Sequence, residues 1–181
     1  ASAFERKGEE FSAIVKLGRT QLQDAVPMTL GAEMRAYGVT IREDVDRLRV
    51  TIGMLGEINL GGTAIGTGVA APEGYRALVF AELLALTELP LTPAADLMEA
   101  SWDAGVFVLV SSVLKRVATK LSKVANDLRL LSSGPRGGFG EIRLPPMQPG
   151  SSIMPGKVNP VICEMVNQVA FHVIGSDVTI S

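Results

Sequence analysis

The chain of 181 residues is long enough to bury a hydrophobic core without help from disulfide bonds. Hydrophobic residues make up 47% and charged residues 20% of the sequence, a balance that excludes an intrinsically disordered protein. The 17 basic and 19 acidic residues give a net charge of −2, without a polybasic block, so we expect neither nucleic acid nor a membrane surface as a partner. The single cysteine, Cys163, cannot form an internal disulfide and favours the cytoplasm.

Apolar residues recur every three or four positions in five segments, which is the spacing of an amphipathic helix. In chain order these segments are 5–15, 29–55, 73–86, 104–131 and the stretch from Pro160 onward. Asp44 is the only polar residue on the apolar stripe of segment 29–55. The two longest segments would each be roughly 40 Å long as helices. The sequence therefore predicts an all-α fold, built as an elongated bundle of long helices.

Glycine and proline mark the connections between these helices, and no alternating pattern predicts a strand. The expected loops are 16–27, 59–72, 89–95 and 132–158. A loop as long as 132–158 is uncommon inside a compact domain and usually carries function. We therefore expect the chemistry of the protein in this last loop.

Residues 150–160 read Gly-Ser-Ser-Ile-Met-Pro-Gly-Lys-Val-Asn-Pro. This order resembles the signature loop of the fumarase/aspartase superfamily, whose members catalyse a reversible β-elimination to fumarate. Residues 18–27, Gly-Arg-Thr-Gln-Leu-Gln-Asp-Ala-Val-Pro, resemble a second active-site segment of the same superfamily, and segments 61–68 and 126–136 also resemble it. The resemblance implies that residues 1–181 are the central helical-bundle domain, truncated at both ends, with an N-terminal segment and a small C-terminal domain missing.

The resemblance also implies roles for individual residues. Ser151, the first serine of the signature loop, would be the general base that removes a proton next to a substrate carboxylate, and Ser152 is the competing candidate. An alkoxide base requires strong stabilisation of its negative charge, which backbone N–H groups, Lys157 and the start of the last helix can supply. Lys157 and Asn159 would bind a substrate carboxylate.

Thr20 and Gln21 resemble the pair that contacts the substrate from the upstream segment. Many relatives carry a histidine in place of Gln21, often beside a glutamate equivalent to Glu164. Glutamine exchanges hydrogen bonds but does not titrate, so a proton relay through this position is in doubt.

Gln21 and the run 159–169 resemble aspartate ammonia-lyases more than fumarate hydratases. The expected reaction is the β-elimination of ammonia from L-aspartate. A fumarate hydratase is the alternative within the same fold, and a non-catalytic helical scaffold is the alternative for the isolated chain. The resemblance further implies a homotetramer with active sites shared between subunits. No cofactor is expected, and one histidine and one cysteine offer no metal-ligand set.

The state of the signature loop is a separate expectation. Some of the partners on which the loop would close belong to segments that the chain lacks, so the closed state loses its stabilisation. We therefore expect residues 150–157 to be open or mobile, with Ser151 exposed and out of hydrogen-bond reach of Thr20 and Gln21 of the same chain.

Overall fold

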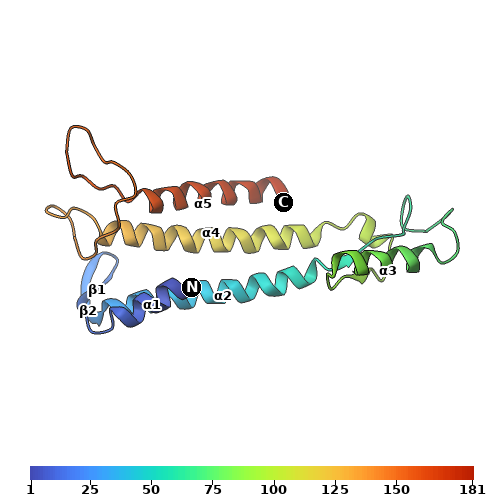
Figure 1. Ribbon diagram of the computed structural model, residues 1–181, viewed down its shortest axis with the longest axis horizontal. Coiled ribbons are helices and arrows are strands. Elements are labelled where there is room, and N and C mark those ends of the chain that lie inside the picture. The colour runs from blue at the N-terminus through green and yellow to red at the C-terminus, as the bar shows by residue number, and fades with distance from the viewer. The chain divides into compact units, whose positions relative to one another are not determined.

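The computed structural model describes all residues from Ala1 to Ser181 (Figure 1). Helix accounts for 54% and strand for 9% of it, which confirms the predicted all-α class. The helices are α1 (Ser2–Glu10), α2 (Leu30–Met54), α3 (Tyr75–Thr87), α4 (Gly105–Leu131) and α5 (Val161–Ile180), with a 3₁₀ helix η1 (Glu99–Ser101). The strands are β1 (Val15–Thr20), β2 (Gln23–Thr29), β3 (Glu57–Ile58) and β4 (Thr92–Pro93).

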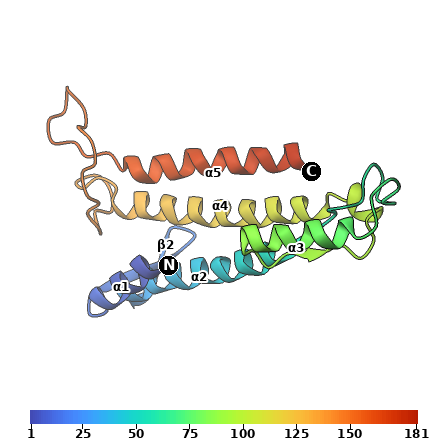
Figure 2. The ribbon, with the colours of Figure 1, turned by 45° about the vertical axis from the view of Figure 1, so that its right-hand side comes forward.

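The chain divides into two compact units, each with its own packing. The first comprises Ala1–Asp46 and Leu114–Thr179, and the second comprises Arg47–Val113 and Ile180–Ser181. In the first unit, the second half of α4 lies between α5 and the first half of α2 (Figures 1 and 2). The predicted helices 29–55, 73–86, 104–131 and the last helix are confirmed to within two residues at their ends.

The core of the first unit lies where α2 meets α4 near the amino end of α2. Leu30, Met34, Tyr37 and Val124 are buried there, and the ring of Phe4 on α1 meets Tyr37 edge-on at 5.6 Å between centroids. Helix α1 rests directly on α2, because a Cβ added to Gly31 would lie 2.3 Å from the carbonyl oxygen of Gly8. Only a residue without a side chain permits this approach.

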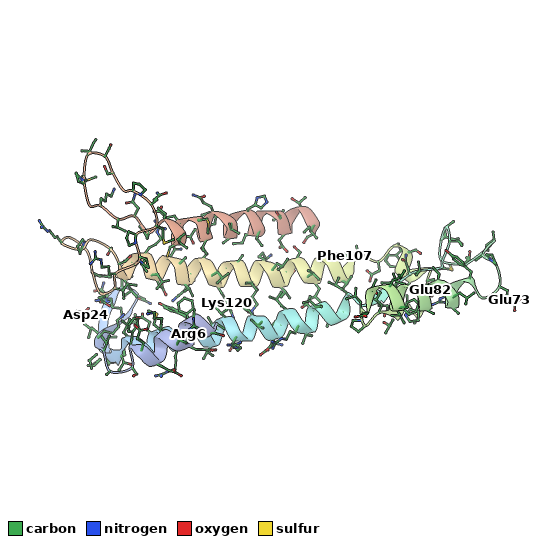
Figure 3. The ribbon with its side chains drawn as sticks, viewed as in Figure 1. Arg6, Asp24, Glu73, Glu82, Phe107 and Lys120 are labelled. Atoms are coloured by element: carbon green, nitrogen blue, oxygen red, sulfur yellow. The ribbon has the colours of Figure 1, made fainter.

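Further along the bundle, pairs of polar side chains hold α4 against α2 and against α5. Asp44 on α2 is 3% exposed, and its carboxylate lies 3.1 Å from both Lys120 Nζ and Arg116 Nε on α4. Lys120, which Figure 3 shows on α4 facing α2, also donates to the carbonyl oxygen of Thr40 at 3.1 Å. The polar residue on the predicted apolar stripe is therefore paired rather than solvated, as a buried charge must be.

An amide pair performs the same task between α4 and α5. The buried Asn167 donates from Nδ2 to Asn126 Oδ1 at 2.8 Å and accepts from Ser122 Oγ at 2.8 Å. Both polar atoms of the Asn167 side chain are thus satisfied inside the helix contact, which fixes the register of α5.

The prediction that residues 16–27 form a loop is wrong. They form most of an antiparallel hairpin in which β1 pairs with β2, with Val15 opposite Thr29 and Thr20 opposite Gln23. A register shift falls at Gly18, where β2 carries one extra residue. The predicted helix 5–15 is also displaced, because α1 begins at Ser2 and ends at Glu10. The carbonyl groups of Phe11 and Ile14 instead accept the N–H groups of Gly31 and Leu30 at the start of α2.

The long loop 132–158 contains no regular secondary structure, as predicted. Its beginning is nevertheless attached to the helices, since Glu141 and Ile142 donate their N–H groups to the carbonyl of Leu131, at 2.8 and 3.3 Å. Ile142 also packs against the buried core cluster. The loop therefore leaves the bundle from a fixed point.

The second unit contains α3, η1 and the two-residue parallel pair β3–β4. Residues 59–72 form a connection without regular structure, as predicted, and residues 89–95 do so apart from β4. A Cβ added to Gly66, whose φ is +95°, would lie 2.3 Å from the backbone of Leu97, so this turn packs directly on the segment before η1. None of the helices is long and apolar enough to cross a lipid bilayer.

Replacing Asp44 by Ala should destabilise the first unit. Lys120 and Arg116 would lose their buried partner but can still reach water, so we expect a loss of about 2 kcal/mol in the free energy of unfolding. Glu43 is the matched control, because it pairs with the same two cations from an exposed position, at 3.5 and 3.7 Å. Glu43→Ala should cost less than about 0.5 kcal/mol. Urea denaturation of both variants measures the difference, and equal losses would contradict the role given to Asp44.

Candidate active site

The signature loop is narrow at its base. A Cβ added to Gly150 would lie 1.7 Å from the carbonyl oxygen of Lys157, so the two ends of segment 150–157 touch through their backbones. Lys157 N–H donates to the carbonyl of Met154 at 3.1 Å, and Gly156 adopts a φ of +83° to complete the turn. Residues 150–157 thus form a closed backbone loop, with Ser151 at its start.

The hydroxyl oxygen of Ser151 accepts two backbone hydrogen bonds. The N–H groups of Ile153 and Met154 donate to Ser151 Oγ at 3.1 and 3.2 Å. Two converging N–H dipoles stabilise negative charge on an oxygen, as they do in an oxyanion hole. Ser152 is exposed and its hydroxyl makes no such contact. The geometry therefore distinguishes the two serines.

The other residues predicted near this loop occupy its end and the start of α5. Lys157 is exposed and forms no ion pair in the chain, and Asn159 is half-buried. Glu164, in the first turn of α5, lies 3.9 Å from Arg129 Nη2 on α4. Cys163 beside it is buried, and burial raises the pKa of its thiol, so the cysteine is a packing residue rather than a nucleophile.

Thr20 and Gln21 lie at the tip of the β1–β2 hairpin, and both are exposed. The turn consists of Gln21 and Leu22, whose φ angles are +51° and +62°. Positive φ at both central residues defines the tight hairpin turn that normally uses Asn-Gly. Neither residue here is of that type, so the backbone is strained at a predicted substrate contact, where such strain is typically found.

The hairpin tip and the signature loop are not brought together within the chain. Ser151 makes its hydrogen bonds inside its own loop and none to Thr20 or Gln21. No hydrogen bond or ion pair joins Glu164 to Gln21, and the carboxylate of Glu164 instead lies beside Arg129. Ser151 itself is half-buried rather than exposed, because its loop folds back over it. The expected separation is therefore observed, and the expected exposure of Ser151 is not.

A network of charged side chains, which sequence reasoning missed, joins β1 of the hairpin to α2 and to the long loop. Lys16 Nζ on β1 is 2.5 Å from Glu33 Oε2 on α2 and 2.9 Å from Glu141 Oε2 in the long loop. Arg19 on β1 forms a second ion pair with Glu141, and its guanidinium stacks on the ring of Phe139 at 4.2 Å. No sequence motif predicts these ion pairs, because the residues that form them are far apart in the sequence.

Burial and the two neighbouring cations, Lys16 and Arg19, shift the pKa of Glu141 in opposite directions. Desolvation favours the neutral carboxyl, but the positive charges of Arg19 and Lys16 outweigh it and lower the pKa of Glu141 below its usual value. Tyr37, which donates to Asp127 Oδ2 at 2.9 Å, has a raised pKa, first because it is buried and then because Glu33 and Asp127 lie near it. Glu141 therefore stays ionised and Tyr37 stays protonated.

Two cavities bear on the choice of site. A cavity of about 470 Å³ lies under the hairpin and is lined by Lys16, Arg19, Gln21, Leu22, Tyr37 and Asp127, among others. A larger one of about 800 Å³ lies in the second unit, around Arg76 and Asp96. There Arg76 donates to the carbonyl of Ala94, and Asp96 accepts from the N–H groups of Met98 and Glu99. Both charged side chains are thus engaged in hydrogen bonds with backbone groups. No three His, Cys, Asp or Glu side chains gather as a candidate metal site.

Known proteins resemble the chain along nearly its whole length. A family model described as "Lyase" matches residues 1–175. The chain belongs to this lyase family. The predicted membership of the fumarase/aspartase superfamily is thereby confirmed. Aspartate ammonia-lyase of Pseudomonas aeruginosa is 63% identical over 180 residues, which are 99% of the chain and 38% of that enzyme. The enzyme of the same name from Escherichia coli K12 is 57% identical over 98% of the chain and 37% of its own length.

Two solved structures share the fold. The fumarate lyase:delta crystallin from Brucella melitensis, crystallised with cobalt, superimposes with a TM-score of 0.95 at 59% identity, covering 98% of the chain and 39% of its own. A class II fumarase from Schistosoma mansoni gives a TM-score of 0.93 at 34% identity, covering 98% of the chain and 40% of its own. The chain thus spans about two fifths of the length of the lyases that it matches.

Replacing Gly150 by Ala should open the base of the signature loop, because no side chain fits against the carbonyl of Lys157. We expect trypsin to cut after Lys157 at least about fivefold faster, as a local destabilisation of roughly 1 kcal/mol implies. Gly137→Ala in the same long loop is the control, since an added Cβ there meets nothing within 4 Å. Mass spectrometry of the fragments reports the rate at Lys157. Equal rates in the two variants would contradict the close contact.

Proposed function

We propose that the chain is the central helical domain of an aspartate ammonia-lyase, which converts L-aspartate reversibly to fumarate and ammonia. The 63% identity to the Pseudomonas aeruginosa enzyme over 99% of the chain is the observation that carries the proposal. The relatives of the same name from Escherichia coli and Helicobacter pylori, at 57% and 55% identity, agree with it.

In the proposed reaction, Ser151 as an alkoxide removes the proton from the carbon next to the side-chain carboxylate of aspartate. The electron pair of the broken C–H bond moves into that carboxylate and gives an aci-carboxylate dianion. Ammonia then leaves from the neighbouring carbon as the double bond of fumarate forms. The N–H groups of Ile153 and Met154 support Ser151 in this role, because they stabilise negative charge on Oγ. Ser152 lacks such donors.

The remaining residues bind the substrate in this proposal. Lys157 and Asn159 contact a carboxylate, and the free ammonium group of Lys157 suits the growing charge of the dianion. Thr20 and Gln21 contact the substrate from the hairpin tip. Glu164 supports the site from the first turn of α5, next to Arg129. Gln21 does not titrate, so the pair of Gln21 and Glu164 does not relay protons.

We also propose a homotetramer with active sites shared between subunits. The separation of Ser151 from Thr20 and Gln21 within one chain supports this arrangement, because a complete site then requires a second copy. The outer face of α5 supports it as well, since Ile162, Met165 and Val169 are 47–57% exposed at helical spacing. A cytoplasmic location stays a prediction from the cysteine content.

Turnover of a complete lyase carrying this chain tests the reaction. We expect fumarate to form from L-aspartate, with much less or none from L-malate. Faster turnover of L-malate would favour the alternative, a fumarate hydratase. The Schistosoma mansoni fumarase has the same fold, so the fold agrees with either reaction. The 181-residue chain alone should be inactive, and activity equal to that of the complete protein would refute the need for further segments.

Ser151→Ala should remove the base and leave the carboxylate contacts in place. We expect kcat for L-aspartate to fall at least about a hundredfold while KM stays within about threefold. Ser152→Ala is the matched control and should keep most of the activity. The assignment of the base is wrong if Ser152→Ala is the inactive variant.

Sedimentation of the complete protein tests the assembly. A tetramer is expected at micromolar concentration, because the exposed apolar face of α5 is unfavourable in water. A stable, non-aggregating monomer would contradict the shared active site.

A further inference from the structure

Glu141 joins two segments that carry predicted active-site residues. It lies in the long loop that leads to Ser151, and its carboxylate forms ion pairs with Lys16 and Arg19 on β1, the strand that ends at Thr20. All three side chains are largely buried, with exposed fractions of 19% for Glu141, 9% for Lys16 and 20% for Arg19. Ion pairs shielded from water to this extent are stronger and less screened than surface pairs.

The carboxylate of Glu141 is held at a fixed place. Its own N–H and that of Ile142 donate to the carbonyl of Leu131 at the end of α4, and Ile142 packs on the buried core cluster. Glu141 is therefore attached to the rigid bundle by backbone bonds and by packing. A charge on such an anchor can position whatever pairs with it.

The hairpin, in contrast, lies largely outside the buried core. Every residue of β2 from Gln23 to Pro27 is exposed, and a cavity of about 470 Å³ lies between the hairpin and the helices. Its turn at Gln21 and Leu22 is strained, and such a backbone conformation persists only where the surroundings enforce it. At the base of the hairpin, Thr29 Oγ1 accepts the N–H of Ala32 on α2 at 3.0 Å. Nearer the tip, the side chains that bind other elements are Lys16 and Arg19, through their ion pairs with Glu33 and Glu141 and the stacking of Arg19 on Phe139.

We propose that Glu141 is a positioning residue for the hairpin tip: through Lys16 and Arg19 it holds Thr20 and Gln21 in the geometry that binds the substrate. This inference rests on the proposed function only for the statement that Thr20 and Gln21 contact a dicarboxylate. Glu141 does not touch the substrate, and both of its oxygens are engaged by cations of the chain. Its removal should therefore weaken substrate binding and leave the proton abstraction by Ser151 largely unchanged.

Glu141→Gln in the complete lyase tests the proposal, because the amide keeps the size of the side chain and loses its charge. We expect KM for L-aspartate to rise about tenfold while kcat changes less than about threefold, the pattern of a lost binding contribution. Glu5→Gln is the matched control. It removes an equally close ion pair between α1 and α2, from Glu5 to Arg42 at 2.9 Å, in the same unit but away from the hairpin. Its KM and kcat should stay within about twofold.

A double variant separates positioning from a general loss of stability. If Glu141 acts through Arg19, then Glu141→Gln combined with Arg19→Gln should raise KM no more than the larger of the two single effects, because residues of one network are not additive. An unchanged KM in Glu141→Gln, a loss confined to kcat, or an effect equal to that of Glu5→Gln would each overturn the proposal.

Hydrogen exchange gives a readout that does not depend on the reaction. In Glu141→Gln the backbone amides of residues 19–23 should exchange at least about fivefold faster than in the unmodified protein, and in Glu5→Gln they should not. If the unmodified protein fails to convert L-aspartate, the proposed function falls, and the exchange rates still decide whether Glu141 holds the hairpin. If the unmodified protein is active and both KM and exchange are unchanged in Glu141→Gln, the inference alone falls.

Discussion

The contact between α2 and α4 in the first unit sets the relative position of the two segments that carry Ser151 and the pair Thr20 and Gln21. The hairpin with Thr20 and Gln21 runs directly into the amino end of α2, and the loop with Ser151 begins at the carboxyl end of α4. A shift of one helix along the other would displace the two segments relative to each other. The buried cluster around Tyr37 and Val124 and the pairing of Asp44 with Lys120 oppose such a shift.

Charge fulfils two different tasks in this unit. Asp44 is enclosed between two helices whose positions the apolar packing already favours, so its pairs mainly specify register. Glu141 works outside the buried core, between an irregular loop and an exposed hairpin beside a cavity. There the ion pairs add to the stacking of Arg19 on Phe139. A polar connection of this kind positions a segment while leaving room beside it for a substrate, which a filled core would not.

The sequence predicted the helices well because their signal is local and repeated. The stripe of apolar residues from Leu30 to Leu55 and its equivalent on α4 each extend over many turns, and one dominant spacing explains them. The hairpin was missed for the opposite reason. Its exposed strands need no apolar alternation, and its turn uses Gln21 and Leu22, which carry none of the usual signs of a turn with positive φ.

The candidate site was predictable only as far as its residues lie within continuous motifs. Ser151, Lys157 and Asn159 belong to one loop, and Thr20 and Gln21 to one segment, so order along the chain identified them. Glu141 and its cations bridge segments far apart in the sequence, and only the fold brings them together. The distinction between Ser151 and Ser152 also required coordinates, because it depends on which hydroxyl the N–H groups of Ile153 and Met154 face.

The absence of contact between Ser151 and the hairpin tip has a consequence for the proposed enzyme. Glu141 connects the two segments mechanically, although they do not meet within one chain. If each contributes to a different site of a tetramer, as proposed, the same carboxylate is linked to the substrate contacts of one site and to the base-bearing loop of another. Because Glu141 is attached to the end of α4, it holds both segments against the same helix without requiring the two to touch.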